Sequence, residues 1–149
     1  MTSYIGPWRT APWDASRWPN FTARELACPC CGEIDVWPRA LDCVQRLRTA
    51  MAAPLVVDSG HRCALHNARV GGAPLSQHKR LAFDVALAGH DPMQLERRAR
   101  AAGFTGFGYA NSFLHLDTRA RPAWRTRPAH WFYGKRSIEK WTSLGLSVR

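Results

Sequence analysis

Two short segments in which apolar and polar residues alternate most constrain the fold of this chain. Residues 81–87 read LAFDVAL and residues 113–117 read FLHLD. Successive side chains of a β-strand point to opposite faces, so each segment predicts a strand with one apolar face. Asp84 lies on the polar face of the first strand, and His115 and Asp117 share a face of the second. A carboxylate among apolar neighbours needs a partner, which makes Asp84 a candidate for a functional site.

Two longer helices are predicted, one before the first strand in the sequence and one between the two strands. Apolar residues at helical spacing predict a helix over residues 38–53, and a second helix is predicted over 92–103 with Asp91 as its cap. A shorter helix follows a cap at Asn20 or Thr22.

Further strands are predicted over residues 54–60, as a buried strand, and over 104–110, which meets the 112–117 strand across a tight turn. Residues 60–78 are rich in Gly, His and small polar residues, which is typical of a loop with one helical turn.

The chain length of 149 residues predicts one domain, or one domain with a short appendage. We expect residues 1–20 to form an irregular N-terminal arm, because tryptophans and prolines are frequent there and aliphatic residues are few. The indoles of this arm would cover the core. Residues 20–149 form the main domain and end in a basic tail with a helix over 137–142.

The positive net charge of the chain favours polyanions as binding partners. Lys and Arg number 21 against 11 Asp and Glu, a net charge of +10, which favours nucleic acid, anionic lipid or an anionic cell wall. The longest apolar runs are far too short to cross a membrane. The first residues lack the pattern of a signal peptide, so we expect synthesis in the cytoplasm without export by that route.

The five cysteines leave two interpretations open. Cys28, Cys30 and Cys31 lie in the sequence CPCCG, whereas Cys43 and Cys63 stand alone. Cys43 would complete a set of four thiolates for a second metal site if the helix that carries it folds back. Otherwise the cysteines are reduced thiols, partly buried as small apolar residues.

Three side chains that bind metals follow in order along the chain. His78 precedes the first alternating strand, Asp84 lies on its polar face, and His115 lies on the second strand. Two imidazoles and one carboxylate are a suitable set for catalytic zinc, because they leave a fourth position for water.

The segment SGHRCALHNARVGGAPLSQHKRLAFDVAL resembles the zinc D-Ala-D-Ala carboxypeptidase family, which includes many bacteriophage endolysins. The family pattern runs SGxR, HN, a GG-containing loop, SxH and AxD, and closes with a strand of the type seen in FLHLD. The upstream NFTARELACPCCG and the 38–53 helix also resemble this group, so the resemblance covers roughly residues 20–120.

The resemblance implies a small α+β domain with a short antiparallel sheet, helices on one side and zinc in a surface groove. It implies that His78, Asp84 and His115 bind the zinc ion. Arg62 matches the arginine that holds substrate and stabilises the oxyanion, work that suits a permanently charged, forked guanidinium. Ser76 matches a serine near the substrate, although a hydroxyl that caps its own loop is an equal interpretation.

The chain departs from the family pattern at two positions. In HKRLAFD, Asp84 follows His78 by six residues rather than seven, and a glycine is missing; we expect the loop at residues 79–80 to absorb this change. Ser112 stands where many relatives carry an acidic residue three positions before the last histidine ligand. Asp117 is then either the general base or a carboxylate that orients His115 or Arg119.

His61 and His66 are further candidates to carry protons, with hydrogen bonding within the loop as their alternative role. The resemblance implies a zinc peptidase that hydrolyses peptidoglycan stem peptides or cross-links containing D-amino acids, as a phage lysis enzyme acting at the cell wall or carried by the virion. If it acts as a free enzyme, we expect a monomer.

The first alternative is a non-catalytic virion, tail or wall-docking protein that keeps the peptidase fold. A nucleic-acid-binding protein is the second, because aromatic residues alternate with arginines over residues 119–136. That composition is less specific than the ordered His and Asp motifs.

Overall fold

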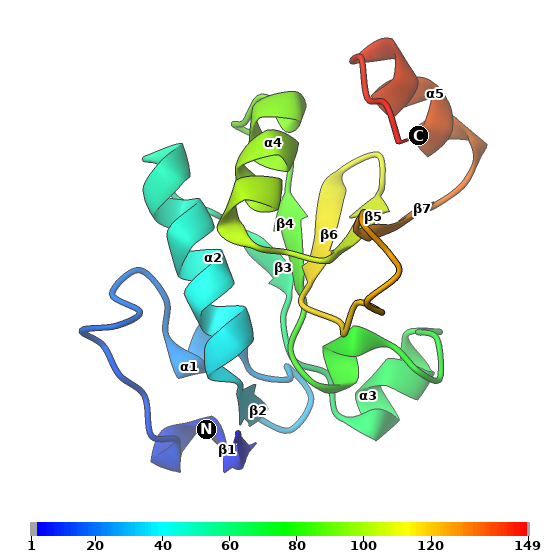
Figure 1. Ribbon diagram of the computed structural model, residues 1–149. Helices are drawn as coiled ribbons and strands as arrows, with labels where there is room; N and C mark the ends of the chain where they lie inside the picture. Colours follow the sequence, from blue (N-terminus) through cyan, green and yellow to red (C-terminus); the bar gives the residue numbers. More distant parts are fainter. Residues whose placement is uncertain (1–2, 149) are drawn as a thin grey trace.

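The larger of two β-sheets forms the centre of the protein. The structure is a computed structural model that describes residues 3–148. Its five-stranded sheet has the order β3-β4-β6-β5-β7 (Figure 1). The strands in that order are β3 (Val57–Ser59), β4 (Phe83–Ala86), β6 (Phe113–Asp117), β5 (Gly106–Tyr109) and β7 (Ala129–Phe132). The predicted α+β class is confirmed. The strand predicted over 54–60 is shorter than expected, and the prediction that it is buried is wrong, because β3 is a partly exposed strand at the sheet edge.

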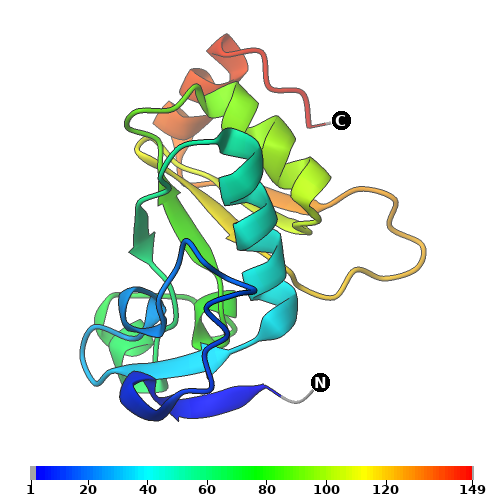
Figure 2. The ribbon, with the colours of Figure 1, turned by 90° about the vertical axis from the view of Figure 1, so that its left-hand side faces the viewer.

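The expectation of an antiparallel sheet is wrong at β7, which runs parallel to β5. The residues of β7 fall within the predicted basic tail, for which no strand is expected. The loop over residues 118–128 carries the chain away from β6 and back to the start of β5 (Figure 2). There the backbone N–H of Ala129 donates to the carbonyl of Thr105 at 2.9 Å. A loop of this length reverses the chain, so β7 lies beside β5 in the same direction.

A smaller sheet joins the N-terminal arm to the domain. The strand β1 (Tyr4–Pro7) pairs antiparallel with β2 (Glu33–Val36). A 3₁₀ turn, η1 (Trp8–Thr10), directly follows β1. The prediction of a wholly irregular arm is therefore wrong for residues 4–10, because the backbone groups of β2 offer an edge for pairing. The indole of Trp18 is buried in the core, as expected of the arm.

Five helices lie within residues 3–148, and a side-chain cap starts three of these five. They are α1 (Ala23–Leu26), α2 (Pro38–Met51), α3 (Ala64–Arg69), α4 (Pro92–Ala102) and α5 (Lys135–Ser143). Thr22, rather than Asn20, caps α1 in a reciprocal arrangement with Glu25. The Asp91 carboxylate accepts from the first backbone N–H groups of α4, and Gly103 ends that helix in the left-handed conformation.

Helices α2 and α4 lie side by side on one face of the large sheet (Figures 1 and 2). Their apolar residues Leu41, Leu47 and Leu95 are fully buried in one core with Phe83 and Leu116 of the sheet. Each such side chain contributes about 1.5–3 kcal/mol of stability. Because alternate strand residues face the other way, the side chains of Asp84 and His115 are left for the opposite face.

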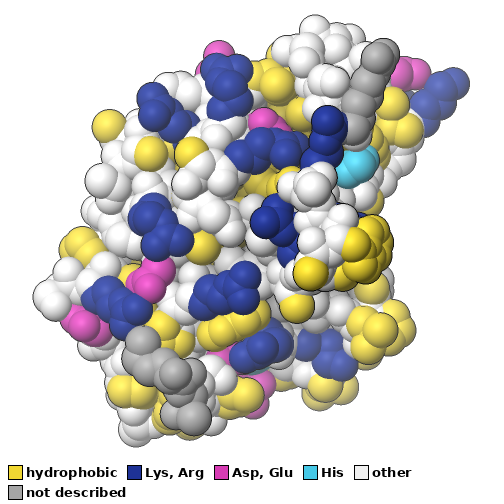
Figure 3. All heavy atoms as spheres, in the orientation of Figure 1, with side chains coloured by type: hydrophobic (Ala, Val, Ile, Leu, Met, Phe, Trp, Pro, Cys, Tyr) yellow, Lys and Arg dark blue, Asp and Glu magenta, His cyan; other side chains and the backbone are white. Residues whose placement is uncertain are grey.

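The basic side chains are dispersed rather than gathered in one patch. On the face that carries α2 and α4, Lys and Arg are scattered between apolar and uncharged groups (Figure 3). Within residues 3–148, none of the helices combines the length and the apolar character needed to cross a bilayer.

Candidate metal centre

The register of two central strands brings two of the predicted ligands together. Asp84 of β4 and His115 of β6 are directly paired across the sheet. His78 lies in a 3₁₀ turn, η2 (Gln77–Lys79), that precedes β4. The Nε2 atom of His78 is 3.1 Å from Asp84 Oδ1 and 3.1 Å from His115 Nδ1, and His115 Nδ1 is 3.0 Å from Asp84 Oδ1. All three side chains are buried.

The hydrogen bonds behind the two rings fix which nitrogens face the centre. The Nδ1–H of His78 donates to the carbonyl of Gly60 at 2.7 Å, which leaves its Nε2 lone pair directed at Asp84. The Nε2–H of His115 donates to Asp117 Oδ2 at 2.8 Å, which leaves its Nδ1 lone pair directed at the same point. Partners of this kind on the outer nitrogen are typical of metal-binding histidines.

The electrostatics of the centre favour the ionised form of Asp84 and shift the pKa values of the two histidines in opposite directions. Burial opposes ionisation of Asp84, but the hydrogen bonds that His115 and His78 donate to it when their inner nitrogens are protonated outweigh burial and hold the pKa of Asp84 well below its usual range. Burial lowers the pKa of His78. Burial also opposes a charge on His115, but hydrogen bonds to Asp117 and Asp84 raise its pKa overall. A proton and a metal cation would therefore compete for His115.

Arg80 lies within the six-residue connection from His78 to Asp84. The backbone turns there, with φ −104° and ψ −102°, before β4 begins. The Arg80 carbonyl accepts a hydrogen bond from Nδ1 of the buried His61. Its guanidinium stacks on the Trp37 ring at 3.8 Å and lies 3.7 Å from a carboxylate oxygen of the buried Asp35. The short loop is therefore held through both its backbone and its side chain.

Arg62 and Ser76 lie beside the three ligands and line the same pocket. The Nε–H of Arg62 donates to the Ser59 hydroxyl at 2.9 Å, and its Nη2 is 3.4 Å from Asp84 Oδ2. The Ser76 hydroxyl accepts from the backbone N–H of His78 at 3.2 Å, so it caps the turn that carries this ligand.

Asp117 lies behind the His115 ring and does not line the pocket. It is fully buried, and its oxygens accept hydrogen bonds from His115 and from the Nε–H, Nη2–H and backbone N–H of Arg119. Burial opposes ionisation, but the bonds from Arg119 and His115 lower the pKa of Asp117. This geometry fits the orienting role of the two that the sequence left open.

The fallback proton carriers lie away from the pocket. Both ring nitrogens of His61 are engaged, Nδ1 by the Arg80 carbonyl and Nε2 by Glu33 Oε1 at 2.8 Å. His66 lies in α3, and neither it nor the exposed Ser112 belongs to the pocket lining.

The pocket has a volume of about 460 Å³. One of its walls is aromatic and is not predicted from the sequence. Phe113, Trp131 and Tyr133 contribute aromatic surface, and the Trp131 ring centroid lies 5.0 Å from that of His115. The Arg119 guanidinium stacks on Trp131 at 4.6 Å. The alternation of Trp131 and Tyr133 in HWFY is a signal that could have indicated a strand here. It is hard to recognise because the surrounding sequence is rich in arginine.

Comparison with known families matches part of the chain that contains the whole ligand set. The model described as Peptidase M15 matches residues 19–117, well over half of the chain, from the segment before α1 to the end of β6. No curated protein matches the sequence. The ordered motifs, the convergent His and Asp side chains and this match agree, and the chain belongs to the peptidase M15 family, whose members are zinc-dependent metallopeptidases.

Proposed function

We propose that this protein hydrolyses peptidoglycan stem peptides or cross-links that contain D-amino acids, as a phage-type lysis enzyme. The observation that carries the proposal is the convergence of two imidazole nitrogens and a carboxylate oxygen within 3.1 Å of one another beside an open pocket. His78, Asp84 and His115 are the proposed zinc ligands.

The donor set fits zinc in both chemistry and spacing. Two ring lone pairs and a carboxylate that face one another about 3 Å apart repel unless a cation lies between them. Zinc bonds of 2.0–2.1 Å in a tetrahedron separate neighbouring donors by about 3.3 Å, close to the observed 3.0–3.1 Å. Zinc held there would polarise the scissile carbonyl and activate the attacking water.

The side chains around the ligands supply binding and orientation. Arg62 would bind a carbonyl or carboxylate oxygen of the substrate, because its guanidinium reaches the pocket while Ser59 holds its Nε–H. Ser76 would contact the substrate as well as cap the His78 turn. Asp117 would act through His115 as a positioning residue, since both of its oxygens are already engaged.

The charge of the chain supports a wall substrate. A net charge of +10, with Lys and Arg dispersed over the face that Figure 3 shows, would hold the protein on an anionic murein layer. We propose that the protein acts there as a monomer if it is a free enzyme, or else as a component of the virion. Both the carboxypeptidase and endopeptidase reactions use the same set of residues.

One observation favours a second candidate function, a non-catalytic virion or wall-docking protein. Among the described residues that line the pocket, Asp84 is the only carboxylate, and Ser112 stands outside it. A protein without a carboxylate that accepts the proton from water could still bind zinc and stem peptides.

The experiment that tests the proposal is digestion of purified murein by the zinc-loaded protein. We expect new free amino termini or released D-alanine, identified by mass spectrometry, and loss of this activity on chelation. His115→Ala should abolish both the product and the zinc content of the centre. The matched control is His130→Ala, because His130 is exposed on β7 and absent from the pocket lining. Tight binding to murein with no cleaved product would establish the docking function instead.

A further inference from the structure

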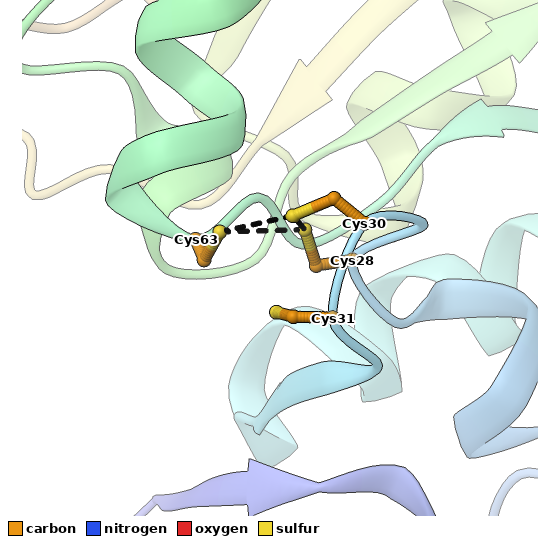
Figure 4. Close-up of side chains that lie close together, drawn as sticks. All are labelled: Cys28, Cys30, Cys31 and Cys63. Carbon is orange, nitrogen blue, oxygen red and sulfur yellow. Dashed lines mark hydrogen bonds between the residues drawn. The ribbon is translucent and has the colours of Figure 1, made fainter.

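A second cluster of metal-binding side chains lies away from the pocket. The four cysteines Cys28, Cys30, Cys31 and Cys63 place their sulfur atoms within 4.8 Å of one another (Figure 4). Three of them lie in the loop between α1 and β2, and Cys63 caps the start of α3. The sequence interpretation that Cys43 completes a set of four thiolates is wrong, because Cys43 is buried in α2 and contacts Arg46.

The spacing of the sulfur atoms fits a tetrahedral ion better than disulfides. The Sγ atoms of Cys28 and Cys30 are 3.5 Å apart, and Cys63 Sγ lies 3.7 Å and 3.4 Å from them, respectively. Four thiolates 2.3 Å from a central zinc ion are about 3.8 Å from one another. A disulfide brings its sulfur atoms to about 2.0 Å, and all five cysteines are free.

We propose that Cys28, Cys30, Cys31 and Cys63 bind a structural zinc ion, separate from the His78, Asp84 and His115 centre. Four thiolates fill the tetrahedron and leave no position for water or substrate, so this ion would support the fold rather than catalysis.

The backbone around the cluster is shaped as a metal-binding loop. The N–H of Cys28 donates to the Glu33 carbonyl at 2.7 Å, and the N–H of Gly32 donates to the Cys28 carbonyl at 2.8 Å. Gly32 has φ +76°, a conformation that favours glycine and turns the chain back toward the sulfurs. The backbone N–H of His66 donates to Cys63 Sγ at 3.4 Å, as outer partners of metal thiolates do.

Positive charge lies close to the cysteine loop. Arg9 and Arg24 line a surface hollow together with Cys28, Cys30 and Cys31. Four thiolates and one Zn²⁺ carry a net charge of −2, which two nearby guanidinium groups would offset. Both guanidinium groups also stack on the Trp8 ring, and Glu25 lines the same hollow, so this charge adds to the geometric argument and does not replace it.

The proposed ion would join the 28–31 loop to the segment that carries Arg62 of the pocket. The 28–31 loop leads into the small sheet, while Cys63 directly follows Arg62. Cross-linking them would hold the 59–64 segment, and with it the Arg62 guanidinium. This consequence, unlike the site itself, rests on the proposed role of Arg62 in the peptidase.

Metal analysis of the full chain tests the site independently of activity. We expect about two zinc ions per chain in protein purified under reducing conditions. A mercurial reagent that blocks thiolates should release about one of them to a chromogenic indicator, from the wild type and from His78→Ala alike. Cobalt substitution should give intense thiolate-to-metal charge-transfer absorption, which a centre of nitrogen and oxygen ligands does not produce.

Two variants make the assignment specific. Cys63→Ser should lose the cobalt–thiolate absorption and the mercurial-released zinc, and amide exchange over residues 59–64 should rise. Cys43→Ser is the matched control, because Cys43 lies outside the cluster, and it should keep both signals. If Cys63→Ser fails to fold, zinc release by the mercurial reagent and cobalt substitution in the wild type still show whether thiolates bind a metal ion. No thiolate-bound metal in reduced wild-type protein, or a mass lower by two hydrogens that shows a disulfide within the cluster, would overturn the proposal.

Discussion

The Nε2 atom of His115 lies 2.8 Å from Oδ2 of Asp117, two residues further along the same face of β6. Because Arg119 holds the same carboxylate through two side-chain bonds of 2.6 Å and 2.9 Å, Asp117 cannot swing toward the pocket without losing both. The bond directs the other ring nitrogen of His115 at Asp84 and His78. The strand thus provides a ligand and the group that orients it.

Asp117→Asn separates the two roles proposed for this carboxylate. If Asp117 orients His115, the substitution should weaken zinc binding by roughly 10–100-fold, because it removes the charge that fixes the ring. Competition against a chromogenic chelator measures this change, and Ser112→Ala provides the control. A fall in turnover at full zinc occupancy and unchanged zinc affinity would identify Asp117 as the general base instead.

Gly106→Ala should disturb the same support from the neighbouring strand. A Cβ atom at residue 106 would lie 2.1 Å from Asp117 Oδ1, so the carboxylate must move. We expect a lower melting temperature and weaker zinc binding, both measurable on the purified variant. Gly108→Ala is a useful contrast, because its Cβ would meet the Trp131 and Tyr133 side chains instead. It should raise KM while zinc binding is retained; equal zinc loss in both variants would contradict this account of Gly106.

Local signals in the sequence predict most of the framework of the site. The alternation in LAFDVAL and FLHLD predicts β4 and β6, while Pro38 at the first position of α2 and the Asp91 cap predict the starts of α2 and α4. These features depend on residues close in the chain, where periodicity and capping act directly. The register that puts Asp84 opposite His115 joins distant residues and comes only from the structure.

The features that the sequence does not predict depend on contacts between distant residues. β7 pairs with β5 only after a long loop, and its Trp131 and Tyr133 resemble the rest of an arginine-rich tail. Cys63 joins the CPCCG loop across the 30 intervening residues 33–62, so sequence spacing offers no preference for it over Cys43. Periodicity carries no information about such distant pairings.

Arg62→Lys tests the binding role proposed for the guanidinium. Lysine keeps the charge but loses the fork that reaches the Ser59 hydroxyl and Asp84 Oδ2 together. We expect kcat/KM on a stem-peptide substrate to fall by roughly 10²–10³-fold, the usual cost of losing an oxyanion donor. Zinc content, measured in parallel, should stay the same. Unchanged kinetics would remove Arg62 from the active site.

Asp42→Asn tests how the N-terminal arm is held. Asp42 accepts bonds from Nε and Nη2 of Arg17 at 2.8 Å and 2.7 Å, and from the Trp18 indole at 2.9 Å. Burial opposes ionisation of Asp42, but these bonds outweigh it and lower its pKa below 3.8. Because the pair is partly exposed, we expect a loss of at most about 1 kcal/mol in the free energy of unfolding.

The pH dependence of that loss has a definite sign. A depressed folded-state pKa gives stability that is fully present above the unfolded pKa and is lost as the pH falls through the folded value. Denaturant titrations of the wild type and of Asp42→Asn should therefore differ by a constant amount above about pH 5 and converge below about pH 4. Asp58→Asn, an exposed site on β3, should show no such convergence. A difference that grows on acidification would contradict the ion pair.

Insertion of a glycine between Arg80 and Leu81 tests whether the short loop has become part of the site. The insertion restores the family spacing between His78 and Asp84, so a weakened relative would gain zinc affinity and activity. The structure leads to the opposite expectation. Leu81 and Phe83 are fully buried, which fixes the register of β4, while His61, Asp35 and Trp37 hold Arg80 on the other side.

An added residue must therefore break one of these anchors or move a ligand. A ligand displaced by about 1 Å is costly to a preorganised site, so we expect weaker zinc binding and slower murein cleavage in the insertion variant. Zinc competition titration of both forms, followed by digestion of murein, measures the two effects separately. A glycine inserted in the exposed loop after Ala120 controls for chain length. Tighter zinc binding together with faster cleavage would show that the present loop limits the site, and that the six-residue spacing is a defect rather than an adaptation.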